Sequence, residues 1–278
     1  MRARAYAHEP TEAANVARSK PAVVFRRGVR AAALAAVLAH AGAVFFLNRR
    51  HRRDLKTRAQ WLQQTCRSLL RVIDVRASSF GHLPDPALIV ANHVSYLDIL
   101  VIAAKTPVVF VAKREVRSWP VFGWFARLAG TRFIDREKRR DVSRVAEELA
   151  PVLAAGVSVV LFPEGTSSDG TCVKAFKTSL FEPAVRQGWP VVPAALSYSV
   201  PPGHSVEQEV CWWGEMKLTP HLLNLLGLPN VDAYVAWESA QPAQGDRKTF
   251  GAHLHERVAR LHAGLVENAR TLLRERSI

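Results

Sequence analysis

The chain has 278 residues, of which 49% are apolar and 22% charged, and a formal net charge of +14. This composition excludes a disordered chain and supplies enough apolar residues for one sizeable core or two small ones. The three cysteines form no Cys-x-x-Cys pair, which argues against a disulfide framework or a zinc knuckle and favours a reducing compartment.

The positive charge is concentrated near the N-terminus. Residues 1–60 carry 13 Lys/Arg against 3 Asp/Glu, a net charge of +10, whereas the other 218 residues carry a net charge of +4. A nucleic-acid enzyme typically spreads its basic residues along the binding face of its folded domain. Clustering around one apolar segment instead favours an anionic membrane surface. We therefore expect the lipid bilayer as a partner and no nucleic acid.

The apolar segment covers residues 31–47 and has arginines on both sides. They are Arg26, Arg27 and Arg30 before it, and Arg49, Arg50, Arg52 and Arg53 after it. A helix of these 17 residues is roughly 25 Å long, at the low edge of what crosses a hydrocarbon core of about 30 Å. A cleaved signal peptide fits poorly, because Arg49-Arg50 stands where the cleavage site would be. The segment is predicted to be a membrane anchor, spanning or shallowly embedded, with a buried core helix as the alternative.

After the anchor, a helical pattern over residues 55–74 leads into short apolar runs that alternate with helical stretches. The expected strands cover residues 87–91, 108–112, 131–134, 157–162, 191–196 and 231–237. The expected helices cover residues 96–104, 121–128, 142–154, 179–187 and 249–274. Strands alternating with helices in this way predict an α/β domain whose sheet is covered by helices on both faces.

The chain is expected to have three parts. Residues 1–25 form a disordered basic N-terminus, and residues 26–54 form the membrane anchor helix with its basic flanks. No Pro/Ser/Gly-rich linker divides the chain from residue 75 to its end, so residues 55–278 are expected to form one domain of catalytic size.

Polar residues directly follow the apolar run 87–91, at a place where functional sites gather in α/β sheets. His93 and Asp98 are suited to a general base, because a carboxylate fixes the imidazole tautomer and stabilises the cation. On a regular helix the two side chains would lie about 140° apart, so they meet only if His93 is in the turn and Asp98 in the first helical turn. Ser95 fits as the N-cap of that helix. The spacing Ser95-x-x-Asp98 also fits a capping box, and a purely capping role for Asp98 stays open.

Two further polar clusters follow other apolar runs. Residues 162–170 read Phe-Pro-Glu-Gly-Thr-Ser-Ser-Asp-Gly, a glycine-bearing loop that could present N–H groups to an anion. This loop lacks the Lys-Ser/Thr of a P-loop and the second glycine of a nucleophile elbow, so taken alone it is a tight turn. Residues 130–136 end on Arg136, whose guanidinium is suited to bidentate contact with phosphate.

Together these clusters have a family resemblance. His-x-x-x-x-Asp, Gly-x-x-Phe-Ile-Asp-Arg, Phe-Pro-Glu-Gly-Thr and Val-Val-Pro-Ala-Ala-Leu follow one another in this order. Their order and spacing resemble the glycerolipid acyltransferase family, the lysophosphatidate acyltransferase-like (PlsC-type) enzymes that place an acyl chain on a lysolipid hydroxyl. The resemblance covers roughly residues 84–198. It implies an α/β fold with a mixed sheet covered by helices on both faces, an N-terminal membrane helix and an acyltransferase domain over residues 55–278.

The resemblance also implies roles for individual residues. His93, oriented by Asp98, would take the proton of the lysolipid hydroxyl, which attacks the thioester of acyl-CoA or acyl carrier protein. No metal and no cofactor is expected, and the location expected is the cytoplasmic face of a bacterial-type inner membrane. Acceptor-binding roles are implied for Arg136, Glu164, Gly165, Thr166, Ser167 and Lys177.

Ser167 departs from the pattern of enzymes specific for lysophosphatidate, which read Phe-Pro-Glu-Gly-Thr-Arg-Ser. With serine at this position, the loop resembles that of the lyso-ornithine-lipid acyltransferase branch or of other lysophospholipid acyltransferases. An acceptor phosphate would then be absent, or held by Arg136 with Lys177. Two readings without catalysis also stay open: a peripheral membrane-binding module, which would not require the four motifs, and a membrane-bound pseudoenzyme that keeps the fold without the activity.

Overall fold

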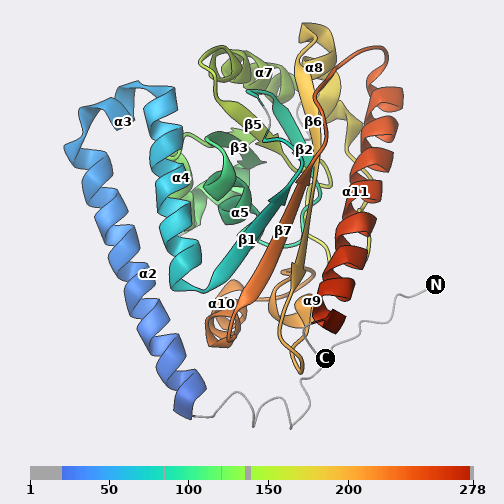
Figure 1. Ribbon diagram of the computed structural model, residues 1–278. Helices are drawn as coiled ribbons and strands as arrows, with labels where there is room; N and C mark the ends of the chain where they lie inside the picture. Colours follow the sequence, from blue (N-terminus) through green and yellow to red (C-terminus); the bar gives the residue numbers. More distant parts are fainter. Residues whose placement is uncertain (1–20, 84, 120, 135–138, 276–278) are drawn as a thin grey trace.

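The computed structural model describes residues 21–275 except for residues 84, 120 and 135–138 (Figure 1). The strands are β1 (Val75–Phe80), β2 (Leu88–Ala91), β3 (Val108–Lys113), β4 (Arg132–Ile134), β5 (Ser158–Leu161), β6 (Pro190–Ser199), β7 (Val231–Trp237) and β8 (Gln241–Pro242). The α-helices are α2 (Pro21–Leu47), α3 (Arg49–Arg53), α4 (Leu55–Val72), α5 (Leu97–Lys105), α6 (Phe122–Leu128), α7 (Arg139–Ala154), α8 (Glu182–Gln187), α9 (Val206–Glu209), α10 (Leu218–Gly227) and α11 (Arg247–Glu275). Two 3-10 helices are η1 (Arg114–Ser118) and η2 (Thr178–Phe181).

The described strands form one mixed sheet in the order β1-β7-β6-β2-β5-β3-β4, with β8 paired to β6. Strands β6, β2, β5, β3 and β4 are parallel to one another, whereas β7 pairs with β6 in the antiparallel sense. The mixed sheet implied by the family resemblance is therefore confirmed. Because β2 lies between β5 and β6 and is parallel to both, the segments that leave the carboxyl ends of these three strands meet at one edge of the sheet.

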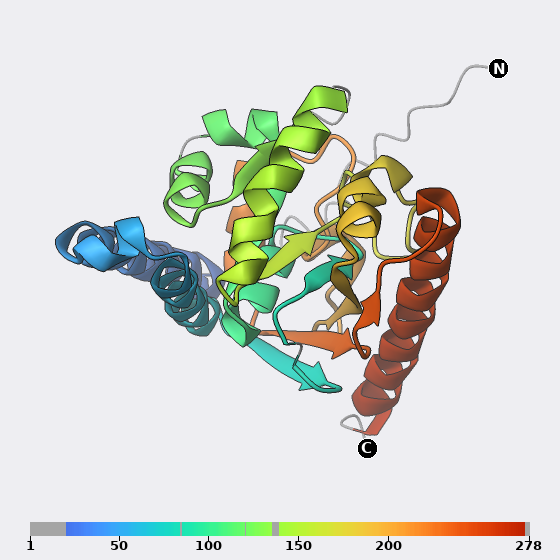
Figure 2. The same ribbon diagram turned by 90° about the horizontal axis from the view of Figure 1, so that it is seen from above.

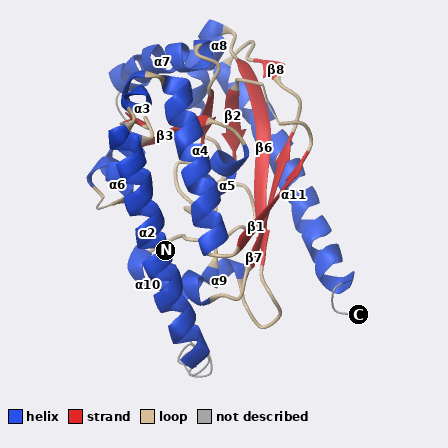
Figure 3. Cartoon of the chain, turned by 60° about the vertical axis from the view of Figure 1, so that its left-hand side comes forward, coloured by secondary structure: helices blue, strands red, loops and turns tan. Residues whose placement is uncertain are grey.

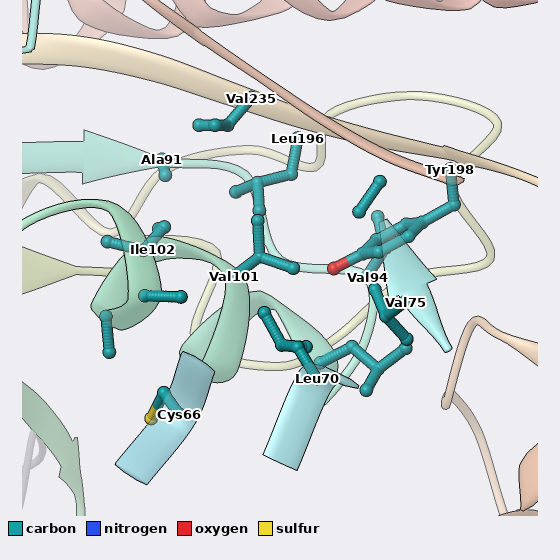
Figure 4. Close-up of a cluster of buried hydrophobic side chains, with 14 of the residues drawn as sticks. Cys66, Leu70, Val75, Ala91, Val94, Val101, Ile102, Leu196, Tyr198 and Val235 are labelled. Carbon is teal, nitrogen blue, oxygen red and sulfur yellow. The ribbon is translucent and has the colours of Figure 1, made fainter. Parts of the chain in front are cut away.

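Helices cover both faces of the sheet, as predicted (Figures 1 and 2). Successive residues of β2 point to opposite faces, so Leu88 and Val90 join one core cluster while Ile89 and Ala91 join the other. Helices α4, α5 and α10 pack on the face of Ile89, and helices α7, α8 and α11 pack on the face of Leu88. Figure 4 shows part of the first cluster, in which Val94 and Tyr198 lie together at one end.

Helix α2 lies outside α4 (Figure 3). It begins five residues before the predicted anchor, residues 26–54, and ends at Leu47, after which Asn48 caps the separate short helix α3. The 27 residues of α2 correspond to about 40 Å, because Pro21 and the residues after it continue the helix in front of the apolar segment. The predicted disordered part, residues 1–25, was therefore wrong for residues 21–25, while residues 1–20 lie outside the described chain. In the described chain, α2 is the one helix that is long and apolar enough to cross a membrane, and 17% of its most apolar window is buried. A buried core helix does not fit this exposure.

Candidate active site

His93 lies in the turn between β2 and α5, which is called here the His93 turn (residues 92–96). Asp98 is in the first turn of α5, and its Oδ2 lies 2.7 Å from His93 Nδ1. The two side chains therefore meet in the way that the turn-then-helix placement requires. Tyr96 rather than Ser95 occupies the N-cap position, although Ser95 Oγ accepts the N–H of Leu97 at 3.3 Å.

Asp98 is fully buried and accepts hydrogen bonds on both of its oxygens. Its Oδ2 accepts the backbone N–H groups of Val94 at 2.7 Å and Ser95 at 2.9 Å in addition to His93 Nδ1. Its Oδ1 accepts the hydroxyl of Tyr198 at 2.6 Å. The two backbone N–H groups can only donate, and the hydroxyl of Tyr198 donates as well, so the group acts as an acceptor-only carboxylate. One carboxylate thus orients the histidine and caps the backbone, and the two interpretations of Asp98 do not exclude each other.

Tyr198 was not among the predicted site residues. It lies near the carboxyl end of β6, beside the strand that leads to His93, and its phenol is buried against Asp98. Burial, followed by the negative charge of Asp98, raises the pKa of Tyr198 well above its ordinary value, so the phenol keeps the proton that it donates. A tyrosine at the end of an otherwise apolar strand was the available sequence signal, since a buried tyrosine usually finds a polar partner for its hydroxyl.

The tautomer of His93 follows from its partner. Since Asp98 Oδ2 can only accept, Nδ1 must carry the hydrogen, and in the neutral ring the lone pair is then on Nε2. The imidazole lies flat against the ring of Phe162, with centroids 4.2 Å apart and an interplanar angle of 14°. The side chain is 20% exposed, whereas Asp98 behind it is not exposed at all. The geometry leaves Nε2 as the basic nitrogen of a ring that is fixed on one side and open on another.

Glu164 fixes the backbone of the His93 turn from the loop after β5, called here the Glu164 loop (residues 163–170). Its Oε1 accepts the N–H of His93 at 2.6 Å, and its Oε2 accepts the N–H of Lys174 at 2.9 Å. From the same loop, the N–H of Ser168 donates to the carbonyl of His93 at 2.9 Å. His93 is therefore held at both backbone groups by the loop that follows the neighbouring strand.

The remaining predicted acceptor-binding residues have different surroundings. Gly165 has a φ of +79°, a left-handed conformation that favours glycine and lets the Glu164 loop turn. Ser167 is buried and its hydroxyl donates to the carbonyl of Trp212, whereas Thr166 and Lys177 are exposed. Arg136 lies outside the described residues. The structure brings Glu164 together with His93, and the acceptor-binding roles of all six residues stay predictions. Among the described residues, no group of three or more His, Cys, Asp or Glu side chains is arranged to hold a metal ion.

Burial of Glu164 should make the stability of the protein depend on pH. The side chain is 4% exposed, and burial raises the pKa of Glu164 from 4.5 to about 7. A raised pKa means that the folded state holds the proton more tightly, so this contribution to stability is complete below pH 4.5 and is lost as the pH rises to about 7. The loss is about 3 kcal/mol at most. Urea unfolding at pH 5 and pH 7 should show Glu164→Gln to be less sensitive to pH than the wild type.

Glu147→Gln is the matched control for this measurement, because Glu147 is an exposed glutamate on α7. It should keep the pH dependence of the wild type. If Glu164→Gln and Glu147→Gln responded to pH alike, Glu164 would not be the group that titrates in this range.

Comparisons with known proteins agree with this architecture. A family model described as Acyltransferase matches residues 72–197. The lyso-ornithine lipid O-acyltransferase of Brucella abortus is 37% identical over 212 residues, which are 70% of this chain and 79% of that protein. The enzyme of the same name from Rhizobium meliloti is 37% identical over 224 residues, 75% of this chain and 76% of that protein. The 1-acyl-sn-glycerol-3-phosphate acyltransferase of Neisseria gonorrhoeae is 42% identical over 115 residues, 41% of this chain and 45% of that protein.

The fold is also similar to a solved structure. The crystal structure of the 1-acyl-sn-glycerophosphate (LPA) acyltransferase PlsC from Thermotoga maritima superposes with a TM-score of 0.64 and 20% sequence identity, over 88% of this chain and 94% of that one. The similarity confirms the predicted fold class, and the sequence relatives confirm the resemblance that the motifs indicated. The chain therefore belongs to the glycerolipid acyltransferase family of lysophosphatidate acyltransferase-like enzymes.

Proposed function

We propose that this acyltransferase moves an acyl chain from the thioester of acyl-CoA or acyl carrier protein to a lysolipid hydroxyl, with His93 as the general base. The observation that carries the proposal is the 2.7 Å contact between His93 Nδ1 and Asp98 Oδ2, which leaves the lone pair of Nε2 free. The contact suits proton transfer, because the buried carboxylate stabilises the imidazolium that forms.

The proposed reaction is a direct transfer. The proton of the lysolipid hydroxyl goes to His93 Nε2 while the hydroxyl oxygen attacks the thioester carbonyl. The tetrahedral intermediate then collapses, the carbon–sulfur bond breaks, and the leaving thiolate takes the proton back from His93. Asp98 keeps its charge throughout, and backbone N–H groups near the Glu164 loop would stabilise the oxyanion. No covalent enzyme intermediate, metal or cofactor is needed in this scheme.

We propose lyso-ornithine lipid rather than lysophosphatidate as the preferred acceptor. The lyso-ornithine lipid relatives match 70% and 75% of this chain, whereas the Neisseria lysophosphatidate relative matches 41%. In addition, Ser167 replaces an arginine that could bind phosphate with two parallel hydrogen bonds, and its own hydroxyl is already donated to Trp212. An arginine at this buried position would have to displace Trp212, so the wild-type protein is the better subject for a test of acceptor choice.

The test is a panel of lyso-ornithine lipid, lysophosphatidate and lysophosphatidylethanolamine, each assayed with acyl-CoA and with acyl carrier protein. We expect kcat/KM to be highest for lyso-ornithine lipid, by about ten-fold over lysophosphatidate. A wild-type preference of about a hundred-fold for lysophosphatidate would contradict the proposed acceptor. Absence of transfer to every acceptor would favour the pseudoenzyme.

We further propose that α2 lies in the membrane interface rather than crossing the bilayer. Both ends of the helix contact the folded domain: Arg26 donates to the carbonyl of Gly227 at the end of α10, and the ring of Phe45 packs against Trp61 of α4 with centroids 4.9 Å apart. A helix that is bound to the domain at both ends cannot span a membrane without drawing the domain into it. A cytoplasmic location fits the proposed donors and the free cysteines Cys66, Cys172 and Cys211.

A further inference from the structure

Two arginines of α2 are directed at the carboxyl end of α10 rather than at solvent. Arg26 Nη1 donates to the carbonyl of Gly227 at 2.9 Å. Arg30 donates to the carbonyls of Leu226 at 3.2 Å, Leu228 at 2.5 Å and Pro229 at 2.9 Å. The last carbonyls of a helix lack intrahelical partners and carry partial negative charge, so guanidinium groups suit them. These arginines, expected from the sequence to face lipid headgroups, cap a helix of the folded domain.

Helix α10 contacts α2 closely and also contacts the His93 turn. A Cβ on Gly227 would lie 3.0 Å from Cγ1 of Val23, so the two helices approach at a point where a larger side chain would not fit. About two turns earlier, α10 carries His221, which is 5% exposed. His221 Nδ1 lies 3.0 Å from the hydroxyl of Tyr96, and Tyr96 is between His93 and Asp98 in the chain.

The hydrogen-bond pattern of His221 fits a neutral imidazole that joins two segments. Its Nε2 lies 2.9 Å from the carbonyl of Cys211, which can only accept, so Nε2 carries the hydrogen and Nδ1 accepts from Tyr96. Burial lowers the pKa of His221, in agreement with a neutral ring. His221 therefore holds the His93 turn and the chain at Cys211 to the same helix.

The residue after Cys211 bridges the two loops of the site. The N–H of Trp212 donates to the carbonyl of Val94 at 2.8 Å, in the His93 turn. Its carbonyl accepts the hydroxyl of Ser167, in the Glu164 loop. One peptide group thus bonds both the loop that carries His93 and the loop that carries Glu164, in addition to the direct bonds of Glu164 and Ser168 to His93.

We infer that the segment from α9 to α10, residues 206–227, couples the packing of α2 on the domain to the geometry of the His93 turn. Arg30 and His221 act as positioning residues in this coupling. Arg26 and Arg30 hold the end of α10, α10 holds Tyr96 and Cys211 through His221, and Trp212 joins the two loops. The chain of contacts is continuous from the proposed membrane helix to the proposed base. The inference rests on the proposed acyl transfer for its kinetic consequence, and it predicts that turnover depends on Arg30 even when the acceptor is not in a membrane.

The kinetic test uses the full chain, acyl-CoA and a short-chain lysolipid that stays monomeric in water. Arg30→Gln should lower kcat about ten-fold with KM changed less than about two-fold, because a misplaced base slows the chemical step. Arg30→Lys should recover part of the loss, since one ammonium cannot reach three carbonyls as a guanidinium does. Arg71→Gln is the matched control, because Arg71 is an exposed arginine at the end of α4 and the substitution removes the same charge. Equal kcat values for Arg30→Gln and Arg71→Gln would overturn the inference.

Amide hydrogen exchange tests the same coupling without turnover. The N–H groups of Val94, Ser95 and Trp212 should exchange faster in Arg30→Gln and in Tyr96→Phe than in the wild type or Arg71→Gln. In a protein that carries both Arg30→Gln and Tyr96→Phe, these N–H groups should exchange no faster than in the more affected single variant. The reason is that the two substitutions interrupt the same series of contacts. Unchanged exchange at Trp212 in both single variants would overturn the inference.

Measuring kcat and amide hydrogen exchange together distinguishes a failure of the coupling from a failure of the proposed acyl transfer. A wild type that transfers no acyl chain would contradict the function, and the exchange data would still decide the coupling. If Arg30→Gln did not fold, Tyr96→Phe would test the coupling from its other end, because it removes one hydroxyl only. A Tyr96→Phe protein with the kcat and the exchange rates of the wild type would then overturn the coupling.

Discussion

Replacing Asp98 with Asn should lower kcat about a hundred- to a thousand-fold while leaving most of the fold intact. The amide oxygen can take the place of Oδ2 and keep the bonds from His93, Val94 and Ser95, with the amide NH₂ facing the hydroxyl of Tyr198. What disappears is the negative charge that stabilises the imidazolium during proton transfer. The measurement is kcat with the melting temperature of the same preparation.

Ser95→Ala is the comparison that separates capping from catalysis. It removes an oxygen that accepts the N–H of Leu97 at 3.3 Å, but it leaves Asp98 and His93 unchanged. We expect a lower melting temperature for this variant, by the few degrees typical of one lost hydrogen bond at a helix start, and kcat within about three-fold of the wild type. An Asp98→Asn protein that lost stability and kept its rate would show that the carboxylate is only a cap.

Substitution of the exposed apolar residues of α2 should release the protein from membranes. Phe25, Phe46 and Leu47 are 74%, 50% and 85% exposed, so they are free to enter a bilayer interface. A fully exposed side chain of this kind contributes about 1.5–3 kcal/mol when it leaves water, and replacing all three with Ser should weaken vesicle binding at least about a hundred-fold. Sedimentation with vesicles of mixed zwitterionic and anionic phospholipid measures the loss.

Two comparisons complete this membrane test. Phe80→Ser with Leu83→Ser removes exposed apolar side chains at and after the end of β1 and should leave binding unchanged. Salt at about 1 M should leave the wild type bound, because apolar insertion is not screened as charge attraction is. Full release of the wild type by salt, or normal binding of the triple variant, would contradict insertion of α2.

Most of the sheet was predictable because its central strands are continuous apolar runs. All six expected strands are present, whereas β1 and the two-residue β8 were missed. The sequence of β1, Val-Arg-Ala-Ser-Ser-Phe, is polar in the middle, and β1 lies at an edge where only β7 pairs with it. Helix α10 was also missed as an element, because an apolar stretch of its length fits a buried segment or a membrane contact equally well.

In the candidate site, contacts between residues close in the chain were predictable from the sequence, whereas contacts between distant residues were not. The meeting of His93 and Asp98 was predictable from helix geometry, since five residues separate them. The contact of Tyr198 with Asp98 spans 100 residues and depends on the order of the strands, which the chain pattern does not show. The docking of Arg30 on α10 depends in the same way on distant packing, and charge clustering alone cannot tell a helix-capping arginine from one that faces lipid.

The role proposed for His93 is to activate the lysolipid hydroxyl for direct attack on the thioester. The measurement is thiol release from the thioester donor by the wild type, His93→Ala and His253→Ala, each with and without lysolipid; His253 is an exposed histidine on α11. The wild type and His253→Ala should release thiol only when lysolipid is present, and His93→Ala should be slower by about a thousand-fold with an unchanged circular dichroism spectrum. Thiol release that is independent of lysolipid would contradict direct attack, and a His93→Ala protein as fast as the wild type would contradict the role of His93 as the base.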